Sequence, residues 1–304
     1  MNGLIALDVG GTSIKVGIIT SSGFLLTPGI THYPSLAKED KETLLNHFTT
    51  IILKQLESTP SPIHLVGVGM AFPGPFDYKN GIPLMQNINK YDSLYGISIG
   101  REILNRLRTY EAFTAISSPS CSLKFENDAS LYALGETVLN PELMQGKVLC
   151  LCIGTGLGSA FLEDGQLITN RCDVPENGWV YDTPFLESII DDYISARGIL
   201  NLHQTLHQIT VPDVKTIADL ALKGDTAALK TFEYFGTYFA KAITCFLETF
   251  KPDTLVIGGQ IAKSFSLFEE AFNEQLQKIA PSINITLSTD SSLSTLVGVS
   301  RLFG

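Results

Sequence analysis

A short segment near the N-terminus combines the residue types that bind phosphate groups and a metal ion. Its members are Asp8, Gly10, Gly11, Thr12 and Lys15. Glycine lets the backbone turn tightly and present consecutive N–H groups to an anion. Thr12 can add a hydroxyl donor, and Asp8 is placed to hold Mg²⁺, usually through water. An ordinary Gly-Gly hairpin with a solvated Asp8 is the other interpretation.

A second glycine segment follows an apolar run in the middle of the chain. It consists of Gly154, Thr155 and Gly156. Because a strand-like run follows it rather than a helix, it is not the dinucleotide-binding fingerprint. Aligning Gly11-Thr12 on Gly154-Thr155 indicates a weak internal repeat, although Asp8 then falls opposite Leu151. Two such hairpin loops could hold one polyphosphate from both sides.

Two further segments place polar residues or glycines where a predicted strand passes into a helix. Asn127 and Asp128 follow a short strand, and Gly258 and Gly259 follow a strand at 254–257. A carboxylate such as Asp128 can accept the proton of a sugar hydroxyl as that hydroxyl attacks a phosphoryl group. The glycine pair lets the backbone pack flat against a base or a ribose. Helix capping and helix-start packing are the alternative interpretations.

The elements that must position these segments are predicted from hydrophobic periodicity. Apolar residues recur at helical spacing from Leu44 to Leu56, and we expect further helices over about 184–196, 214–222 and 226–250. Apolar, β-branched runs predict strand meanders at the start of the chain and from Lys147. Strands followed by helices, twice over, predict an α/β protein of two lobes. A chain of 304 residues is long enough for two cores.

Composition limits the classes of partner. The chain has 21 Lys and Arg against 31 Asp and Glu, a formal net charge of -10. Nucleic acid is held by basic residues that neutralise phosphates, so we expect no nucleic-acid partner. Five cysteines, an odd number, indicate a reducing compartment rather than a disulfide framework. Neither a signal peptide nor an apolar run of about 20 residues is found, so we expect a cytoplasmic protein without a membrane partner.

The four segments in this order resemble the ROK family of sugar kinases and sugar-responsive repressors, within the actin/hexokinase-like superfamily. The resemblance extends from Asp8 to the helix that contains residues 297–300. It implies two ribonuclease-H-like lobes with a cleft between them. The small lobe would comprise residues 1–118 plus about 292–304, and the large lobe residues 119–291. ATP with Mg²⁺ would lie against the larger lobe, and the sugar near the hinge.

The resemblance also implies a role for individual residues. Asp128 would be the catalytic base. The nucleotide would contact Asp8, Gly10, Gly11, Thr12, Lys15, Gly154, Thr155, Gly156, Gly258 and Gly259. The sugar would contact Gly74, Asn87, Asn127, Glu176, Trp179 and Glu187.

The chain departs from the family pattern after the second glycine segment. The usual Glu-x-Gly-His signature is here Glu176-Asn177-Gly178-Trp179. Trp179 cannot accept a hydrogen bond as histidine does, but it can stack on a sugar ring; local packing is the alternative. The cysteine-rich zinc-binding run of many members is missing, so we expect no structural zinc, as in the zinc-free, glucokinase-like branch. Glu187 matches the acidic sugar contact that ends that run, or is a glutamate in the first turn of a helix.

Two histidines have the spacing of a metal-binding pair. His203 and His207 lie four residues apart on a predicted helix. Without a nearby pair of carboxylates, we assign no metal site to them.

The sequence therefore predicts an ATP- and Mg²⁺-dependent sugar kinase that uses Asp128 as its base and acts on glucose or a close relative. N-acetylhexosamine or fructose as acceptor and polyphosphate as donor stay open. A sugar-binding protein that has lost catalysis also stays open, because of Trp179. A repressor is disfavoured for two reasons. The family's repressors carry an added N-terminal helix-turn-helix domain, and we expect none here because the first glycine segment already begins at Asp8. The chain is also acidic, which opposes DNA binding. Whether two copies form a homodimer is also open.

Overall fold

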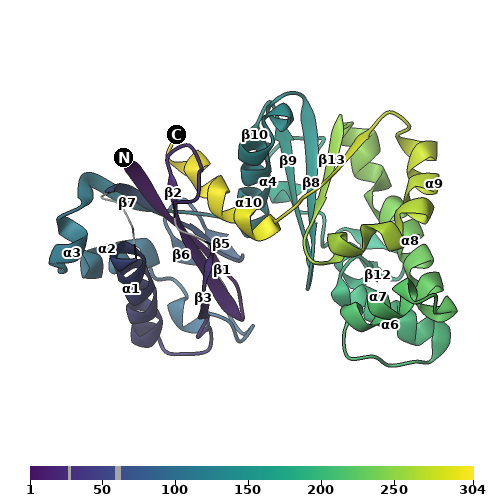
Figure 1. Cartoon of the computed structure of the whole chain (residues 1–304), viewed down its shortest axis with the longest axis horizontal. Coiled ribbons are helices and arrows are strands. Elements are labelled where there is room, and N and C mark those ends of the chain that lie inside the picture. The colour runs from purple at the N-terminus through teal and green to yellow at the C-terminus, as the bar shows by residue number, and fades with distance from the viewer. Residues whose placement is uncertain (27–28, 59–62) are drawn as a thin grey trace. The chain divides into compact units, whose positions relative to one another are not determined.

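The computed structural model describes residues 1–26, 29–58 and 63–304, and these residues form two compact units (Figure 1). The first unit comprises Met1–Asn140 and Ser292–Gly304, and the second comprises Pro141–Ser291. The chain thus leaves the first unit once and returns to it for its last residues. No helix in the described ranges is long and apolar enough to cross a membrane.

A mixed five-stranded sheet forms the centre of the first unit. Its strands are β1 (Asn2–Val9), β2 (Ser13–Thr20), β3 (Thr31–Pro34), β4 (His64–Ala71) and β7 (Ser117–Glu126), in the order β3-β2-β1-β4-β7. Strand β2 is antiparallel to both of its neighbours, whereas β1, β4 and β7 run parallel. The central strands are almost wholly apolar, because both of their faces are covered.

Helices cover both faces of this sheet. On one face, α1 (Lys41–Glu57) and α2 (Ile99–Leu107) bury Phe48 and Ile103 in a core with β1. The other face carries α10 (Ser291–Gly298) and η5 (Val299–Leu302). Strand β4 meets η5 closely, since a Cβ at Gly69 would lie 2.3 Å from Val299. The remaining elements are α3 (Glu111–Thr114), α4 (Asp128–Leu139), η1 (Asp92–Leu94) and the small hairpin of β5 (Phe76–Asp77) and β6 (Ile82–Pro83).

The second unit repeats the sheet topology of the first. Its strands are β8 (Lys147–Ile153), β9 (Leu157–Glu163), β10 (Gln166–Ile168), β13 (Thr254–Gly258) and β14 (Asn284–Leu287), in the order β10-β9-β8-β13-β14. Again the first three strands form an antiparallel meander, and the last two run parallel to the first. Two sheets of the same order and directions are the ribonuclease-H-like arrangement that the sequence predicted, so the internal repeat is a repeat of fold.

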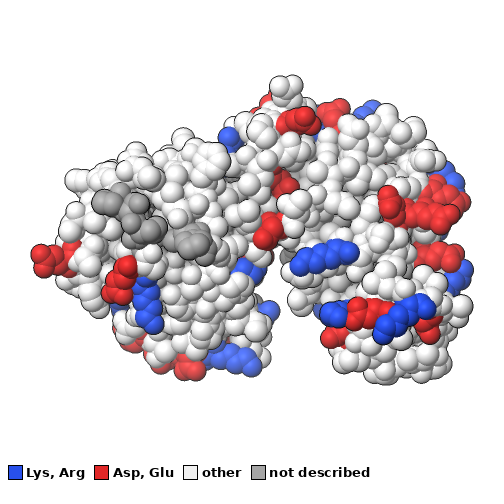
Figure 2. Space-filling model, viewed as in Figure 1, with Lys and Arg blue, Asp and Glu red and all other residues white. Residues whose placement is uncertain are grey.

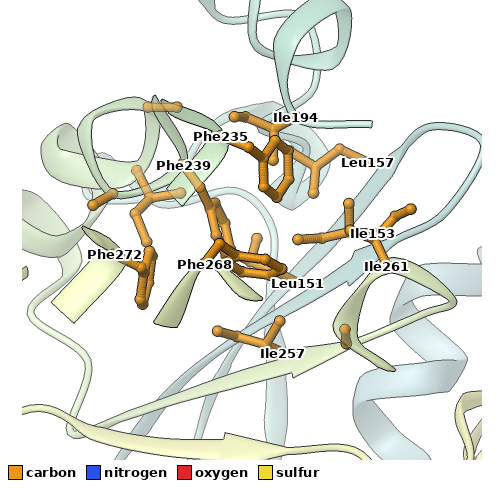
Figure 3. Packing of buried hydrophobic residues seen from close by; sticks show 14 of the residues in the cluster. Leu151, Ile153, Leu157, Ile194, Phe235, Phe239, Ile257, Ile261, Phe268 and Phe272 are labelled. Atoms are coloured by element: carbon orange, nitrogen blue, oxygen red, sulfur yellow. The ribbon is translucent and has the colours of Figure 1, made fainter. Parts of the chain in front are cut away.

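A long helix organises the core of the second unit. Helix α8 (Thr226–Phe250) packs on α9 (Glu269–Ile279), α6 (Ala196–His207) and α7 (Val214–Leu222). Phenylalanines from α8 and α9 interdigitate over the sheet (Figure 3), and the rings of Phe239 and Phe272 lie 4.7 Å apart. Stacked and edge-on rings of this kind stabilise a core beyond their buried area. The short elements are η2 (Pro141–Met144), η3 (Glu176–Gly178), α5 (Ile190–Tyr193) and η4 (Ile261–Leu267).

The structure differs from the sequence expectation at one unit boundary and in one predicted helix. Residues 119–140 belong to the first unit, because β7 pairs in register with β4 and α4 packs on η5. Residues 184–196 do not form one helix. They form a hairpin of β11 (Pro184–Phe185) and β12 (Ser188–Ile189), then α5, and Ser195 is extended before α6 begins. The apolar spacing of this stretch suits either structure, and long-range packing selects the hairpin.

Candidate functional site

In each unit, several of the predicted site segments lie where parallel strands end. In the first unit, the carboxyl ends of β1, β4 and β7 lead into residues 10–12, residues 72–75 and Asn127. In the second unit, the ends of β8 and β13 lead into residues 154–156 and Gly259. Because parallel strands end at one edge of a sheet, each unit gathers these segments at that edge, the usual ligand site of such sheets.

The loop of residues 10–12 is anchored to the first unit through its carbonyl groups. Tyr91 Oη donates to the Gly10 carbonyl at 2.8 Å. Ser35 donates from Oγ to the Gly11 carbonyl at 2.8 Å and from its N–H to the Thr12 carbonyl at 3.1 Å. The N–H groups of Gly11 and Thr12 have no acceptor within the described part of the chain. Two adjacent free N–H groups on an anchored backbone form an anion-binding feature.

Charged side chains lie beside this first loop. Asp8 and Lys15 are opposite each other in the β1–β2 pair, and Lys15 Nζ lies 2.9 Å from Asp8 Oδ2. The positive charge of Lys15 is therefore partly offset. The side chain of Lys90 passes over Gly11, since a Cβ on Gly11 would lie 3.2 Å from Lys90 Nζ. Lys90 makes no ion pair with the described residues, so it leaves an uncompensated cation at the loop.

The loop of residues 154–156 has the same backbone arrangement. The Gly154 carbonyl accepts from the Ala196 N–H at 2.9 Å, and the Gly156 carbonyl accepts from the Gly154 N–H at 2.9 Å. The N–H groups of Thr155 and Gly156 have no acceptor among the residues that the structure describes. A Cβ on Gly154 would meet nothing within 4 Å, so this side of the loop is open.

The glycine pair at the end of β13 lies against the strand that precedes this second loop. Gly258 is opposite Cys152 of β8 in the parallel ladder. Gly259 has a φ of +89°, and a Cβ there would lie 2.2 Å from the Ile153 carbonyl oxygen. Only glycine satisfies both conditions. The pair therefore brings a second stretch of bare backbone beside residues 154–156.

Asn127 and Asp128 have different environments at the start of α4. Asn127 is the N-cap: its Oδ1 accepts from the N–H groups of Ala129 and Ser130 at 3.0 and 3.2 Å. Its Nδ2 lies 3.3 Å from Tyr78 Oη, which donates to the Phe72 carbonyl. The capping interpretation therefore applies to Asn127, and its amide is fixed by partners at both ends.

Asp128 follows this cap, and its side chain is exposed. Its Oδ1 accepts from the N–H of Ala129 at 2.9 Å. The pKa of its carboxyl lies above the ordinary value, because the surrounding protein disfavours the charged form and because the Asp8 carboxylate adds a like charge. A carboxylate with a raised pKa is a stronger base.

The predicted sugar contacts are distributed over both units. In the first, Gly74 follows β4, and Asn87 is exposed with a φ of +61°. In the second, Glu176 is exposed at the start of η3, and the half-buried ring of Trp179 lies 6.1 Å from that of Tyr181. Buried Ser159 of β9 holds this turn, since its Oγ donates to the Gly178 carbonyl and accepts from the Val180 N–H.

Glu187 lies apart from this turn. It follows Leu186 at the tip of the β11–β12 hairpin and is exposed. It is therefore not a first-turn helix residue, which was the alternative interpretation. Its N–H lies 3.4 Å from Tyr193 Oη.

Sequence reasoning missed the residues that hold the two loops and the charged residues that accompany them. These are Ser35, Tyr91 and Lys90 in the first unit, and Asp191 and Arg197 in the second. Tyr91 is 81 residues from Gly10. Asp191 is 34 residues from Leu157, whose N–H donates a hydrogen bond to the Asp191 carboxylate. Contacts at such separations leave no local pattern in one sequence.

Surface charges of both signs are interspersed (Figure 2), and the described residues form no metal-binding cluster. On the face shown in Figure 2, Lys and Arg lie singly or beside Asp and Glu. Arg106, for example, pairs with both Glu42 and Glu102. Within residues 1–26, 29–58 and 63–304, no group of three or more His, Cys, Asp or Glu side chains is arranged to hold a metal ion. That the chain needs no structural zinc stays a prediction.

Two ribonuclease-H-like units with glycine loops at their strand ends define an actin-like ATPase fold. The model of the ROK family matches residues 4–303, and the chain belongs to this family. A glucokinase of Thermotoga maritima is 24% identical over 282 residues, which covers 86% of this chain and 83% of the relative. An N-acetyl-D-glucosamine kinase of Haemophilus influenzae is 23% identical over 288 residues, 86% of each chain.

A solved structure shares the whole fold. The crystal structure of a ROK family glucokinase from Streptomyces griseus, in complex with glucose and AMPPNP, has a TM-score of 0.71. It is 18% identical, and the match covers 99% of this chain and 98% of that one. The predicted family and fold are therefore confirmed. The matched relatives are kinases of sugars, in agreement with the predicted class of enzyme, a phosphotransferase with an alcohol acceptor.

Proposed function

We propose that the chain is an ATP-dependent sugar kinase that transfers the terminal phosphoryl group to a hydroxyl of a hexose, with glucose as the first acceptor. The observation that carries this proposal is the pair of anchored glycine loops, one in each unit, each with two adjacent N–H groups free for an anion. The names of the matched relatives support both the donor and the acceptor.

Backbone donors explain how a chain of net charge -10 would bind an anionic nucleotide. We assign the phosphates to the N–H groups of residues 11–12 and 155–156, with the hydroxyls of Thr12 and Thr155 as further donors. Lys15 and Lys90 add local positive charge. Gly258 and Gly259 present bare backbone to the adenosine. No broad basic surface is required for such a site.

Asp128 is the proposed general base. Its carboxylate takes the proton of the attacking hydroxyl, the new O–P bond forms, and the bond between the terminal phosphorus and the bridging oxygen breaks to release ADP. The raised pKa of Asp128 suits this role, because a stronger base takes the proton more readily. Asn127 caps α4 and fixes the position of Asp128.

The residues beside the first loop fit Mg²⁺. Asp8 Oδ2 accepts from Lys15, and Oδ1 has no partner within the described residues. Mg²⁺ is commonly held by one or two carboxylates, by water and by substrate phosphates, so one open carboxylate oxygen is a suitable contribution. When bound, the ion would offset negative charge on the phosphates.

The sugar is assigned to polar groups and one aromatic ring. Asn127 and Glu176 offer hydrogen bonds to hydroxyls, and the half-buried ring of Trp179 offers a stacking face in place of the family's histidine. Gly74, Asn87 and Glu187 are the further proposed contacts. Ser159 holds the backbone on both sides of Trp179, so the position of the Trp179 backbone is fixed.

An N-acetylhexosamine is the second candidate acceptor, because the matched relatives include an N-acetyl-D-glucosamine kinase. A coupled assay of hexoses and N-acetylhexosamines, each with ATP and with polyphosphate, tests both candidates. We expect phosphorylation of glucose with ATP. The absence of phosphorylation with every acceptor and both donors would contradict the proposed function.

A further inference from the structure

The second glycine loop is held by a carboxylate that belongs to no segment singled out in the sequence. Asp191 Oδ1 accepts from the N–H of Leu157 at 2.7 Å, directly after the free N–H groups of Thr155 and Gly156. Of three consecutive amides, the protein therefore uses the third itself and leaves the first two open. The side chain of Asp191 is 18% exposed, so its position is largely fixed by its neighbours.

Asp191 also explains why residue 156 is glycine. A Cβ on Gly156 would lie 2.8 Å from Asp191 Oδ1, inside the contact distance of carbon and oxygen. Gly154 has no such neighbour, since a Cβ there would meet nothing within 4 Å. The carboxylate therefore lies against the loop at Gly156, and the loop is open at Gly154.

The segment of residues 191–196, which carries Asp191, contacts the second glycine loop at another point. Ser195 Oγ donates to the Asp191 carbonyl at 2.6 Å, and the next residue, Ala196, donates its N–H to the Gly154 carbonyl. Leu157 and Ile194 pack in the same hydrophobic cluster, as Figure 3 shows. Backbone, side chain and core contacts together hold both ends of the loop against residues 191–196.

A negative charge at this place would oppose the binding of phosphate groups, unless it is compensated. Arg197 provides the compensation: its Nη2 lies 2.8 Å from Asp191 Oδ2 and 2.8 Å from Asp192 Oδ1. Its side chain is 54% exposed, so this ion pair is sensitive to salt. Asp192 shares the arginine, but its hydrogen bonds go to Arg197 and Ser188 rather than to the loop, so it offers a matched control.

We propose that Asp191 is a positioning residue for the phosphoryl donor: it fixes the N–H groups of residues 155–156 through Leu157, and Arg197 removes the repulsion that its charge would cause. This inference rests on the proposed function of the loop as a phosphate site. Neither residue is assigned a contact with the sugar, so the effect of their substitution belongs to the donor.

Steady-state kinetics of three variants test the positioning role. Asp191→Ala removes both the acceptor and the charge, and we expect KM for ATP to rise about tenfold or more, the effect of losing a charged hydrogen bond, with KM for the sugar within twofold. Asp191→Asn keeps an oxygen acceptor and is expected to recover most of the loss. Asp192→Asn is expected to behave as the wild type. An unchanged KM for ATP in a folded Asp191→Ala variant would overturn the proposal.

Arg197→Gln tests the charge compensation. Asp191 then keeps its bond to Leu157 but loses its cation, so KM for ATP should rise at low salt, and the increase should shrink when salt is raised. A role confined to stability would lower Tm without a salt-dependent KM. An Arg197→Gln variant whose KM for ATP is the same as that of the wild type at low salt would contradict the compensating role.

Hydrogen exchange separates this proposal from the proposed function. In the unliganded protein, Asp191→Ala should speed exchange of the Leu157 amide about tenfold, and Asp192→Asn should leave it unchanged. This readout needs no kinase activity. If the wild type phosphorylates no sugar but the exchange result holds, the proposed function fails and the anchor stands. If exchange at Leu157 is unaffected by Asp191→Ala, the anchor itself is wrong.

Discussion

Individual side chains at the strand ends divide into those that hold backbone and those that stay open. Tyr91, Ser35 and Asp191 use their polar atoms on loop carbonyls or amides. Asp128 and Lys90 are exposed, and Lys90 makes no ion pair with a described residue. The holding residues fix geometry, and the open ones are available to a ligand, which is the usual separation in a preorganised site.

Asp128→Asn tests the open carboxylate. Because the amide cannot accept the hydroxyl proton, we expect kcat to fall by about 10²- to 10⁴-fold with little change in sugar affinity. Glu136→Gln, on the buried face of the same helix, is the control and should leave kcat of the folded protein unchanged. A kcat equal to that of the wild type would exclude the proposed base.

The pH dependence of kcat/KM reports the ionisation of Asp128. Asp128 works as a base only when it is ionised, so kcat/KM should fall as pH decreases. Because the pKa of Asp128 is raised, this acid limb should have its midpoint above 3.8, the ordinary value for aspartate. A rate that stays constant down to the pH at which the protein unfolds would contradict this assignment.

Lys90 is a residue-scale test of the first loop. Its ammonium lies beside Gly11 and has no ion-pair partner among the described residues. Lys90→Met keeps most of the side-chain length and removes the charge, so KM for ATP should rise several-fold, and more at low salt than at high salt. Lys38→Met serves as a control, because Lys38 is placed at neither loop. Equal KM values for the two variants would remove Lys90 from the donor site.

Elements determine which glycines are required for folding and which are available to a ligand. The two glycine loops end parallel strands, and β13 comes so close to β8 that Gly259 faces the Ile153 carbonyl. Gly154, one residue after Ile153, faces open space. Glycines that look alike in the sequence therefore differ in physical role: the close backbone contact requires glycine at position 259, whereas no protein atom requires it at position 154.

Gly259→Ala and Gly154→Ala form a matched pair. At Gly259, φ is +89° and the added Cβ would lie 2.2 Å from a carbonyl oxygen, so we expect a loss of about 2 kcal/mol or more in unfolding free energy. At Gly154 the added methyl meets no protein atom, so Tm should stay within a degree or two, while KM for ATP rises if phosphate approaches this face. Urea denaturation and steady-state kinetics measure both. Equal stabilities of the two variants would contradict the steric argument.

At the scale of the whole molecule, one ribonuclease-H-like topology is used twice, and each copy has its own core. In the second unit, α6 is fixed on α8 partly through a buried polar contact. His203 is 1% exposed, and its Nδ1 lies 2.8 Å from Thr231 Oγ1. Thr231 donates its hydroxyl hydrogen to the Ala227 carbonyl, so the Nδ1 of His203 is the donor, and Nε2 is a buried acceptor without a described partner.

This histidine should make the stability of the second unit depend on pH. Burial lowers the pKa of His203, and the neighbouring His207 lowers it further. Because the unfolded chain binds the proton more readily, stability is fully present above pH 6.5 and decreases as pH falls below that value, by at most about 1.4 kcal/mol per pH unit. His203→Gln should flatten this slope in urea denaturation between pH 7.5 and 5.5, and His32→Gln, at an exposed position of the first unit, is the control. A slope that His203→Gln leaves unchanged would contradict this origin.

The sequence by itself determined the family, the α/β class and the positions of the glycine loops, because these depend on short runs of residue types. It also predicted helices over 214–222 and 226–250, which the structure has as α7 and α8. Strong periodicity and clear caps make such helices local properties.

The tertiary structure decided what local patterns cannot contain. It assigned residues 119–140 to the first unit through the pairing of β7 with β4, and it replaced the helix expected at 184–196 with a hairpin and α5. It also supplied Tyr91, Lys90 and Asp191 to loops far away in the sequence. The physical reason is that a hydrogen bond or a steric contact between distant residues depends on the packing of the elements that carry them, which no short run of residue types encodes.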